Sequence, residues 1–245
     1  MCLIALMHRV VEGWPLIFGA NREEDYARGG EPPMLWPTKP QFIAGRDPIG
    51  GGTWLGVNAH GVLIAITNRR RSEQPAQPRS RGLLVTYLLA CDHFSSAEAL
   101  GIRELSTHHY AGCNVLIADG ERATVIHHGD WMRVKPLPPG IHILANRDVN
   151  DESDRRSRYA YEMLASQRYP DVDVALLALQ AVCSHHQSPT PICLNGDNRG
   201  TVSSTLIGLT KPLQNSRLHH AQGPPDRAVY FDRSDLFTEL IQEPT

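Results

Sequence analysis

The chain has 245 residues, of which 41% are hydrophobic and 20% are charged, the composition of an ordinary globular protein. Its 24 Lys and Arg against 26 Asp and Glu give a formal net charge of −2, so the sequence gives no reason to expect nucleic acid or an anionic membrane as a partner. No apolar run approaches the roughly eighteen residues of a membrane span. Because no long Gly/Ser linker divides the chain, we expect a single domain over residues 1–245.

Strands dominate the first part of the chain. Short apolar or alternating runs bounded by Gly, Asn and Pro predict strands over residues 3–8, 15–20, 53–57 and 62–68. The first two are expected to pair as an antiparallel hairpin, residues 2–9 with 14–21, around Glu12-Gly13. The proline spacing of residues 32–48 predicts a loop, and residues 69–79 form a polar connection.

Helices and strands then alternate in pairs. An apolar-faced run predicts a helix over 81–91, and Ser95 with Glu98 forms a capping-box pattern that starts a helix reaching about residue 105. Strands are expected at 114–118, 123–127, 132–134 and 142–145, and helices at 153–166 and 172–184, the latter capped by Asp171. Strands at 204–209, 216–220 and 228–231 complete the chain. This order predicts an α+β fold in which two antiparallel sheets stack with helices outside.

The cysteine at position 2 is the most informative single residue. Removal of Met1 would leave the Cys2 thiol and an α-amino group on one residue, and an amine with a pKa of about 7.7–8.0 can accept the thiol proton. Cys2 is therefore a candidate nucleophile that needs no separate histidine. The alternative interpretation is a small core residue on the first strand.

A polar cluster closes the second strand. If the hairpin forms, Asn21, Arg22, Glu23, Glu24 and Asp25 return to the neighbourhood of Cys2. An arginine there can hold a thiolate or a substrate carboxylate, and a carboxylate can orient the α-amine. The alternative is an exposed charged turn.

Three further features are candidates for a binding site. The glycines at 50–52 lead into a strand and lack the Lys of a phosphate loop, so we interpret them as a close backbone approach that seats Thr53 and Trp54. Trp54 either packs in the core or walls a pocket. Ser203 and Ser204 either supply hydroxyls to a cleft or satisfy local amides. A basic cluster is either a solvated loop or a site for an anionic ligand; it consists of Arg69, Arg70, Arg71, Arg79 and Arg81.

The cysteines and histidines show neither a disulfide framework nor a metal motif. Five widely spaced cysteines, without a CxxC pair or a secretory apolar segment, favour a reducing compartment, and we expect the protein to be cytoplasmic. None of the twelve histidines has zinc-ligand spacing with cysteines or lies in an HExxH pattern, so no metal site is expected.

These segments together resemble a known family. Asn21-Arg22-Glu23-Glu24 is similar to the Asn-Arg-Asp-Glu signature of the NRDE family of transport and Golgi organisation 2-like proteins, with Glu23 in place of the aspartate. Other segments agree in order along nearly the whole chain: Met1-Cys2, residues 51–56 (Gly-Gly-Thr-Trp-Leu-Gly), 65–68 (Ala-Ile-Thr-Asn), 80–82 (Ser-Arg-Gly), Asn114 and 200–205 (Gly-Thr-Val-Ser-Ser-Thr).

The family in turn resembles N-terminal-nucleophile hydrolases of the choloylglycine hydrolase and penicillin acylase kind. This resemblance implies a four-layer αββα sandwich and a catalytic Cys2. It also implies that Asn68 and Asn146 form an oxyanion hole, a role worth about 3–4 kcal/mol of barrier in other enzymes. Ala20 stands where those enzymes usually carry an arginine, which Arg22 would replace from another backbone position.

Two functional hypotheses follow. The first is a cysteine N-terminal-nucleophile hydrolase that cleaves a C–N amide bond of a small molecule, with Cys2, Asn21, Arg22, Asn68 and Asn146 in the catalytic site and no cofactor required. The second, from what the family resemblance implies, is a non-catalytic carrier of haem or of an acyl or lipid metabolite that uses the same cleft. The sequence does not indicate the substrate, the oligomeric state or whether Met1 is removed.

Overall fold

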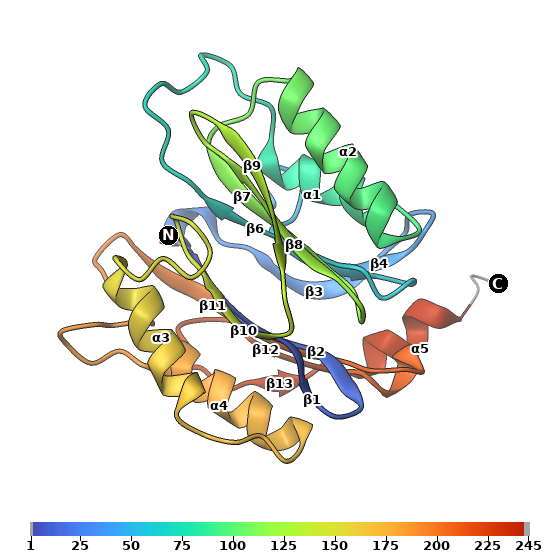
Figure 1. The fold of residues 1–245 in the computed structure, drawn as a ribbon, viewed down its shortest axis with the longest axis vertical. Coiled ribbons are helices and arrows are strands. Elements are labelled where there is room, and N and C mark those ends of the chain that lie inside the picture. Colours follow the sequence, from blue (N-terminus) through green and yellow to red (C-terminus); the bar gives the residue numbers. More distant parts are fainter. Residues whose placement is uncertain (1, 243–245) are drawn as a thin grey trace.

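Two antiparallel sheets stack face to face and helices cover their outer faces, which confirms the αββα sandwich (Figure 1). The computed structural model describes residues 2–242. Sheet A has the strand order β10-β1-β2-β11-β12-β13, and sheet B runs in the order β3-β4-β5-β6-β7-β8-β9.

Sheet A contains β1 (Leu3–Val11), β2 (Trp14–Asp25), β10 (Gly140–Leu144), β11 (Arg199–Leu209), β12 (Arg217–Ala221) and β13 (Phe231–Asp232). Sheet B contains β3 (Glu31–Trp36), β4 (Phe42–Arg46), β5 (Leu55–Asn58), β6 (Leu63–Asn68), β7 (Cys113–Ala118), β8 (Ala123–His128) and β9 (Met132–Leu137). Helices α3 (Arg155–Ala165) and α4 (Val172–Ser184) pack on sheet A, whereas α1 (Arg81–Leu89) and α2 (Phe94–Thr107) pack on sheet B. The C-terminal α5 (Asp235–Ile241) packs against β3 and β4.

Strand alternation divides the apolar side chains among three buried layers. On β1, Ile4 and Leu6 face the other sheet, while Leu3 and Met7 face α3 and α4. The central layer therefore joins the two sheets, and each outer layer joins one sheet to its helices. This burial makes the edges of the sandwich the places where polar side chains can gather.

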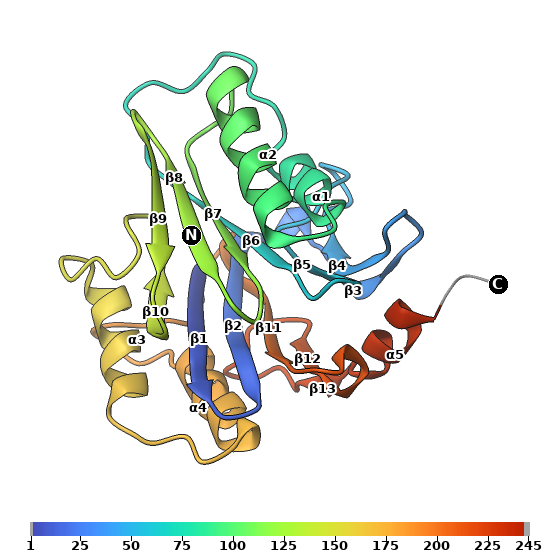
Figure 2. The same cartoon turned by 45° about the vertical axis from the view of Figure 1, so that its right-hand side comes forward.

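The N-terminal hairpin forms as the sequence predicts. β1 pairs with β2 from Leu3 opposite Asn21 to Val11 opposite Trp14, with Gly13 in the turn at a φ of 74°. β2 continues beyond the hairpin to Asp25, and its last residues pair with β11 instead of β1. The start of β1 consequently lies beside the polar end of β2 (Figure 2).

Three local predictions were wrong, one of them the strand expected over 228–231, where only the two-residue β13 (Phe231–Asp232) forms. Residues 32–48 contain β3 and β4 instead of a loop, and the prolines of β3 are tolerated because β3 is the edge strand of sheet B. The Ser95–Glu98 capping box does not start α2, whose N-cap is His93 and whose first residue is Phe94. The sequence also gave no indication of α5. By contrast, Asp171 caps α4 as predicted, accepting a hydrogen bond from the Val174 amide.

Candidate functional site

A pocket of about 390 Å³ opens where β1 begins, and Cys2 lies in its wall. Cys2, Arg22 and Glu23 line it from sheet A, and Trp54 and Asn68 line it from the side of sheet B. The first turn of α1 completes the wall with Ser80, Arg81 and Gly82. We refer to this cavity as the Cys2 pocket. It lies at one end of the sandwich, where both sheets and a helix N-terminus meet.

Trp54 both packs in the core and walls the pocket. Its ring contacts the central apolar layer, and the Arg22 guanidinium lies over it at 4.1 Å from the ring centroid. Arg22 is buried and donates a hydrogen bond to the Gly29 carbonyl. Burial lowers the pKa of Arg22, and the carboxylate of Glu24 opposes that change. Arg22 is thus a fixed cation between the sheets.

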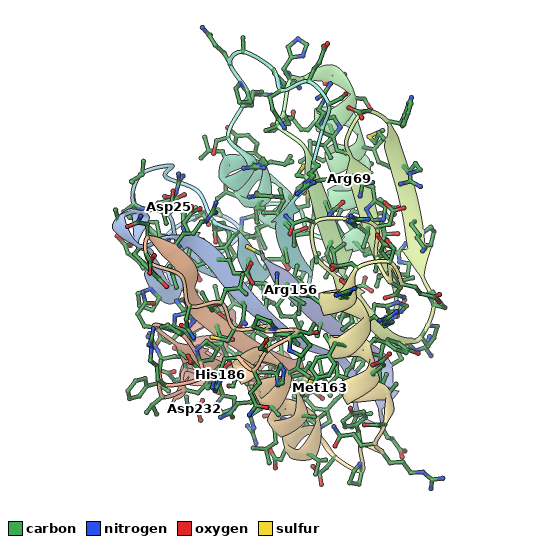
Figure 3. All side chains as sticks on the ribbon, turned by 90° about the vertical axis from the view of Figure 1, so that its left-hand side faces the viewer. Asp25, Arg69, Arg156, Met163, His186 and Asp232 are labelled. Carbon is green, nitrogen blue, oxygen red and sulfur yellow. The ribbon has the colours of Figure 1, made fainter. Side chains whose placement is uncertain are left out.

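Glu23 is a buried carboxylate held from α3. Arg156 Nη2 donates to Glu23 Oε1 at 2.5 Å, and the two side chains are only 16% and 2% exposed. Arg156 also donates to the carbonyls of Pro191 (3.1 Å) and Ile192 (2.9 Å), which fixes its guanidinium. Burial raises the pKa of Glu23, and the charge of Arg156 opposes that rise. In Figure 3, Arg156 lies at the N-terminal end of α3.

The Cys2 thiol is half-buried next to these charges. Burial and the nearby charge of Glu23 raise its pKa, while a hydrogen bond from the Glu23 backbone amide and the charge of Arg22 oppose that rise. A thiol with a raised pKa is protonated at neutral pH and requires a base before it can act as a nucleophile. The base expected from the sequence is the Cys2 α-amine, which is free only when Met1 has been removed. Met1 lies outside the described residues.

Asn68 and Asn146 meet across the two sheets. Asn146 Nδ2 donates to the Asn68 carbonyl at 2.9 Å, and Thr67 Oγ1 donates to the Ala145 carbonyl at 2.6 Å. Asn114 Nδ2 contacts the same carbonyl at 3.1 Å and the Arg147 carbonyl at 3.1 Å. The contacts of Thr67 and Asn114 with the Ala145 carbonyl are buried, and together with the exposed Asn146–Asn68 bond they tie β6 and β7 to the segment that follows β10. They fix where the two asparagines sit.

Only one of these asparagines lines the Cys2 pocket. Asn68 does so, whereas Asn146 lines an adjoining pocket of about 570 Å³, which we call the arginine pocket. Asn68 lines both pockets, so Asn146 lies in the cavity next to the Cys2 pocket. The structure therefore brings Cys2, Arg22 and Asn68 together directly and Asn146 through its hydrogen bond to Asn68.

Two predicted site residues face the opposite side of sheet A. The Asn21 amide donates to the Cys183 carbonyl at 2.8 Å, at the end of α4. Ser204, opposite Asn21 in the register, donates to the Ala20 carbonyl and accepts from the Tyr230 hydroxyl. Neither lines the Cys2 pocket, because the Asn21 amide is directed to the end of α4 and the Ser204 hydroxyl lies against Tyr230.

The remaining predicted residues are distributed around the pocket. Ser203 is buried opposite Arg22 in the register of β2 and β11. Glu24 lines the Cys2 pocket, while Asp25 is exposed and pairs with Arg199 at 3.5 Å. In Figure 3, Asp25 lies at the end of β2, away from Arg156. The close approach expected at the glycines is present, since a Cβ on Gly52 would lie 2.2 Å from the Gly82 carbonyl carbon.

Sequence reasoning missed the groups that hold the site in place. Arg156 is far from Glu23 in the chain, and no motif marks it. Arg28 and Asp47, which line the Cys2 pocket and pair at 2.7 Å, were likewise not identified. The sequence marks Asn114 only as part of a motif, because its hydrogen bonds between the sheets depend on the fold.

Residues 2–242 contain no cluster of three or more His, Cys, Asp or Glu side chains placed to hold a metal ion. Within the same residues, none of the helices combines the length and the apolar character needed to cross a bilayer.

The fold is that of the N-terminal-nucleophile hydrolases. A Caenorhabditis elegans N-acylethanolamine-hydrolyzing acid amidase ortholog superposes with a TM-score of 0.60 and 16% identity, covering 84% of this chain and 92% of that chain. A conjugated bile acid hydrolase from Clostridium perfringens superposes with a TM-score of 0.62 and 10% identity over 96% of this chain and 93% of that chain. Penicillin V acylase from Agrobacterium tumefaciens superposes with a TM-score of 0.61 and 11% identity, covering 100% of this chain and 89% of that chain.

The chain belongs to the Transport and Golgi organisation 2 family, which it matches over residues 1–213. It is 34% identical over 139 residues to the human Transport and Golgi organization protein 2 homolog, covering 54% of this chain and 50% of that protein. The mouse homolog is 33% identical over 141 residues, with the same coverage. The match thus spans about half the length of these relatives.

Proposed function

We propose that this protein is a cysteine N-terminal-nucleophile hydrolase that cleaves a C–N amide bond of a small molecule. The observation that carries the proposal is the position of Cys2, at the start of β1 in a pocket that also contains the buried Glu23 and Arg22 and the amide of Asn68. A carrier that only binds a ligand has no need for a thiol at this position. The names of the superposed enzymes, an acid amidase, a bile acid hydrolase and an acylase, agree with amide cleavage.

The first chemical step is acylation of Cys2. Once Met1 has been removed, the Cys2 α-amine takes the thiol proton and the sulfur attacks the substrate carbonyl carbon. The resulting oxyanion accepts hydrogen bonds from the side chain of Asn68, with Asn146 as the second candidate donor. The C–N bond then breaks, the ammonium returns its proton to the leaving nitrogen, and a thioester remains on Cys2.

The second step regenerates the thiol. The neutral α-amine accepts a proton from water as the water oxygen attacks the thioester carbonyl, and the sulfur leaves with that proton. Carboxylic acid and amine are the two products. Glu23 fits the role of orienting the α-amine, because its carboxylate is buried beside Cys2 and fixed by Arg156. Arg22 supplies positive charge that favours the thiolate.

The test is a search for the acyl-enzyme. Protein shown by intact mass to lack Met1 is incubated with a panel of fluorogenic amides of fatty, aromatic and bile-type acids and quenched in acid. We expect one or more amides to leave an acyl mass on the Cys2 peptide and to release amine continuously. Cys2→Ala serves as the matched control and should do neither.

The same panel separates the hydrolase from the carrier. The carrier hypothesis predicts saturable ligand binding that is equal in wild type and Cys2→Ala, and no amine release from any amide. That result would contradict the hydrolase proposal. For haem, a Soret shift on titration would mark a bound iron ligand. That shift should be absent if the cleft serves amide hydrolysis alone.

A further inference from the structure

The arginine pocket, which adjoins the Cys2 pocket, is lined by five arginines and no carboxylate. They are Arg69, Arg70, Arg71, Arg81 and Arg199, and the cavity measures about 570 Å³. Volumes of this size accommodate organic ligands rather than single ions. The two pockets adjoin, since both are lined by Asn68, Pro78, Arg81 and Ala111.

Only part of this positive charge is paired with carboxylates of the described residues, and Asp130 also attracts Arg69 and Arg71. Arg69 pairs with Asp148 at 2.7 Å and Arg199 with Asp25 at 3.5 Å. Within residues 2–242, however, Arg70, Arg71 and Arg81 have no carboxylate at ion-pair distance. A cluster of like charges without counterions is unfavourable unless solvent ions or a ligand offset it.

Two of these three arginines are already oriented. Arg71 donates to the Tyr110 carbonyl at 3.1 Å and Arg81 to the Gly112 carbonyl at 3.0 Å. A carbonyl satisfies one N–H group of a guanidinium but leaves its charge and its other donors available. Guanidiniums fixed in this way lose little entropy when they bind the oxygens of a phosphate or carboxylate.

We propose that the arginine pocket binds an anionic group, phosphate or carboxylate, on the molecule whose amide is cleaved at Cys2. This inference rests on the proposed function for the position of the amide. Asn68 lines both cavities, so a substrate can present its carbonyl in the Cys2 pocket while its anion lies in the arginine pocket. The substrate class is then amides that carry at least one negative charge beyond the scissile bond.

The binding test uses two inorganic or simple organic probes. Isothermal titration calorimetry measures the affinity for sodium pyrophosphate and for sodium citrate. The ionic strength is kept constant at about 0.15 M, so that salt screens the charges equally in every titration. Arg70→Gln removes an exposed charge that makes no ion pair within the described residues and should weaken binding about tenfold, the value of one charge-assisted hydrogen bond. Arg168→Gln removes an exposed arginine outside the pocket and should leave affinity unchanged.

Each outcome is decisive. Binding of pyrophosphate alone indicates a phosphate-bearing substrate, binding of citrate alone a carboxylate-bearing one, and binding of both an anion site that accepts either; all three support the proposal when Arg70→Gln weakens them. No saturable binding, or an affinity that Arg70→Gln weakens no more than Arg168→Gln does, overturns it. Cys2→Ala should bind the probes with the affinity of wild type. The test of the anion site is therefore independent of the test for acyl-enzyme formation.

Discussion

Loss of the Arg156 guanidinium should destabilise the protein far more than loss of a neighbouring surface arginine. Arg156 and Glu23 are 16% and 2% exposed and meet at 2.5 Å, so solvent screens their interaction little. Arg156→Met keeps most of the side-chain volume but removes one partner of a buried carboxylate and the donors to Pro191 and Ile192. Removing one member of a buried ion pair costs about 3–5 kcal/mol, and we expect a loss of about 3 kcal/mol.

The same helix provides the control. Arg158 and Glu162 form an exposed pair at 3.7 Å, with side chains 57% and 62% exposed, and such pairs contribute at most about 0.5 kcal/mol. Urea denaturation of wild type, Arg156→Met and Arg158→Met at pH 7 measures the two losses. The double variant Glu23→Gln/Arg156→Met should lose less than the sum of its single variants, because the two side chains interact directly. Equal losses for Arg156→Met and Arg158→Met would refute the assignment of a buried ion pair at the site.

Three further perturbations follow from the structure. Burial lowers the pKa of His127 to about 4, so the unfolded chain binds more protons than the folded one between pH 6.5 and 4. The free energy of unfolding should therefore fall as the pH falls through that range. His127→Gln should reduce this fall by about 2 kcal/mol, as measured by urea denaturation at several pH values. Gly52→Ala should cost about 3 kcal/mol or prevent folding, because its Cβ would lie 2.2 Å from the Gly82 carbonyl carbon; an unchanged urea midpoint would contradict that contact. Arg22→Ala should move the pH profile of Cys2 alkylation upward, since the Arg22 charge lowers the thiol pKa.

The sequence predicted the fold well where apolar periodicity was clear. The N-terminal hairpin, the central strands of sheet B and α4 were identified because their apolar residues alternate or recur at helical spacing. The prolines of residues 32–48 hide β3 and β4 from sequence patterns, because proline is unfavourable in central strands, whereas an edge strand needs only half of its backbone donors. The helix start at Phe94 was misplaced because a capping-box pattern also occurs within a first turn.

Part of the candidate site's geometry could be predicted, and for a clear reason. A hairpin brings Cys2 to the end of β2 whatever the rest of the fold does, so its proximity to Arg22 and Glu23 follows from local pairing. Which side chains of β2 face inward depends on the register and on the irregularity between Thr201 and Ser203, which the sequence does not reveal. Arg156 could not have been found, because its contact with Glu23 depends on the packing of α3.

The reactivity of Cys2 tests the account most directly. Burial raises the pKa of Cys113 and Cys183 to about 12 and that of Cys193 to about 11, and that of Cys91 is also raised, so these thiols should react slowly with iodoacetamide. In protein shown by intact mass to lack Met1, Cys2 has a base on its own residue and should be alkylated at least about tenfold faster than the other four. A chain with an N-terminal extension, which has no free amine on Cys2, is the matched control and should lose that advantage. Peptide mapping after partial alkylation measures the order of labelling. The predicted result is that Cys2 is labelled first in the Met1-free protein and loses that advantage in the extended chain. Labelling of Cys2 no faster than the other cysteines in the Met1-free protein would contradict the hydrolase account.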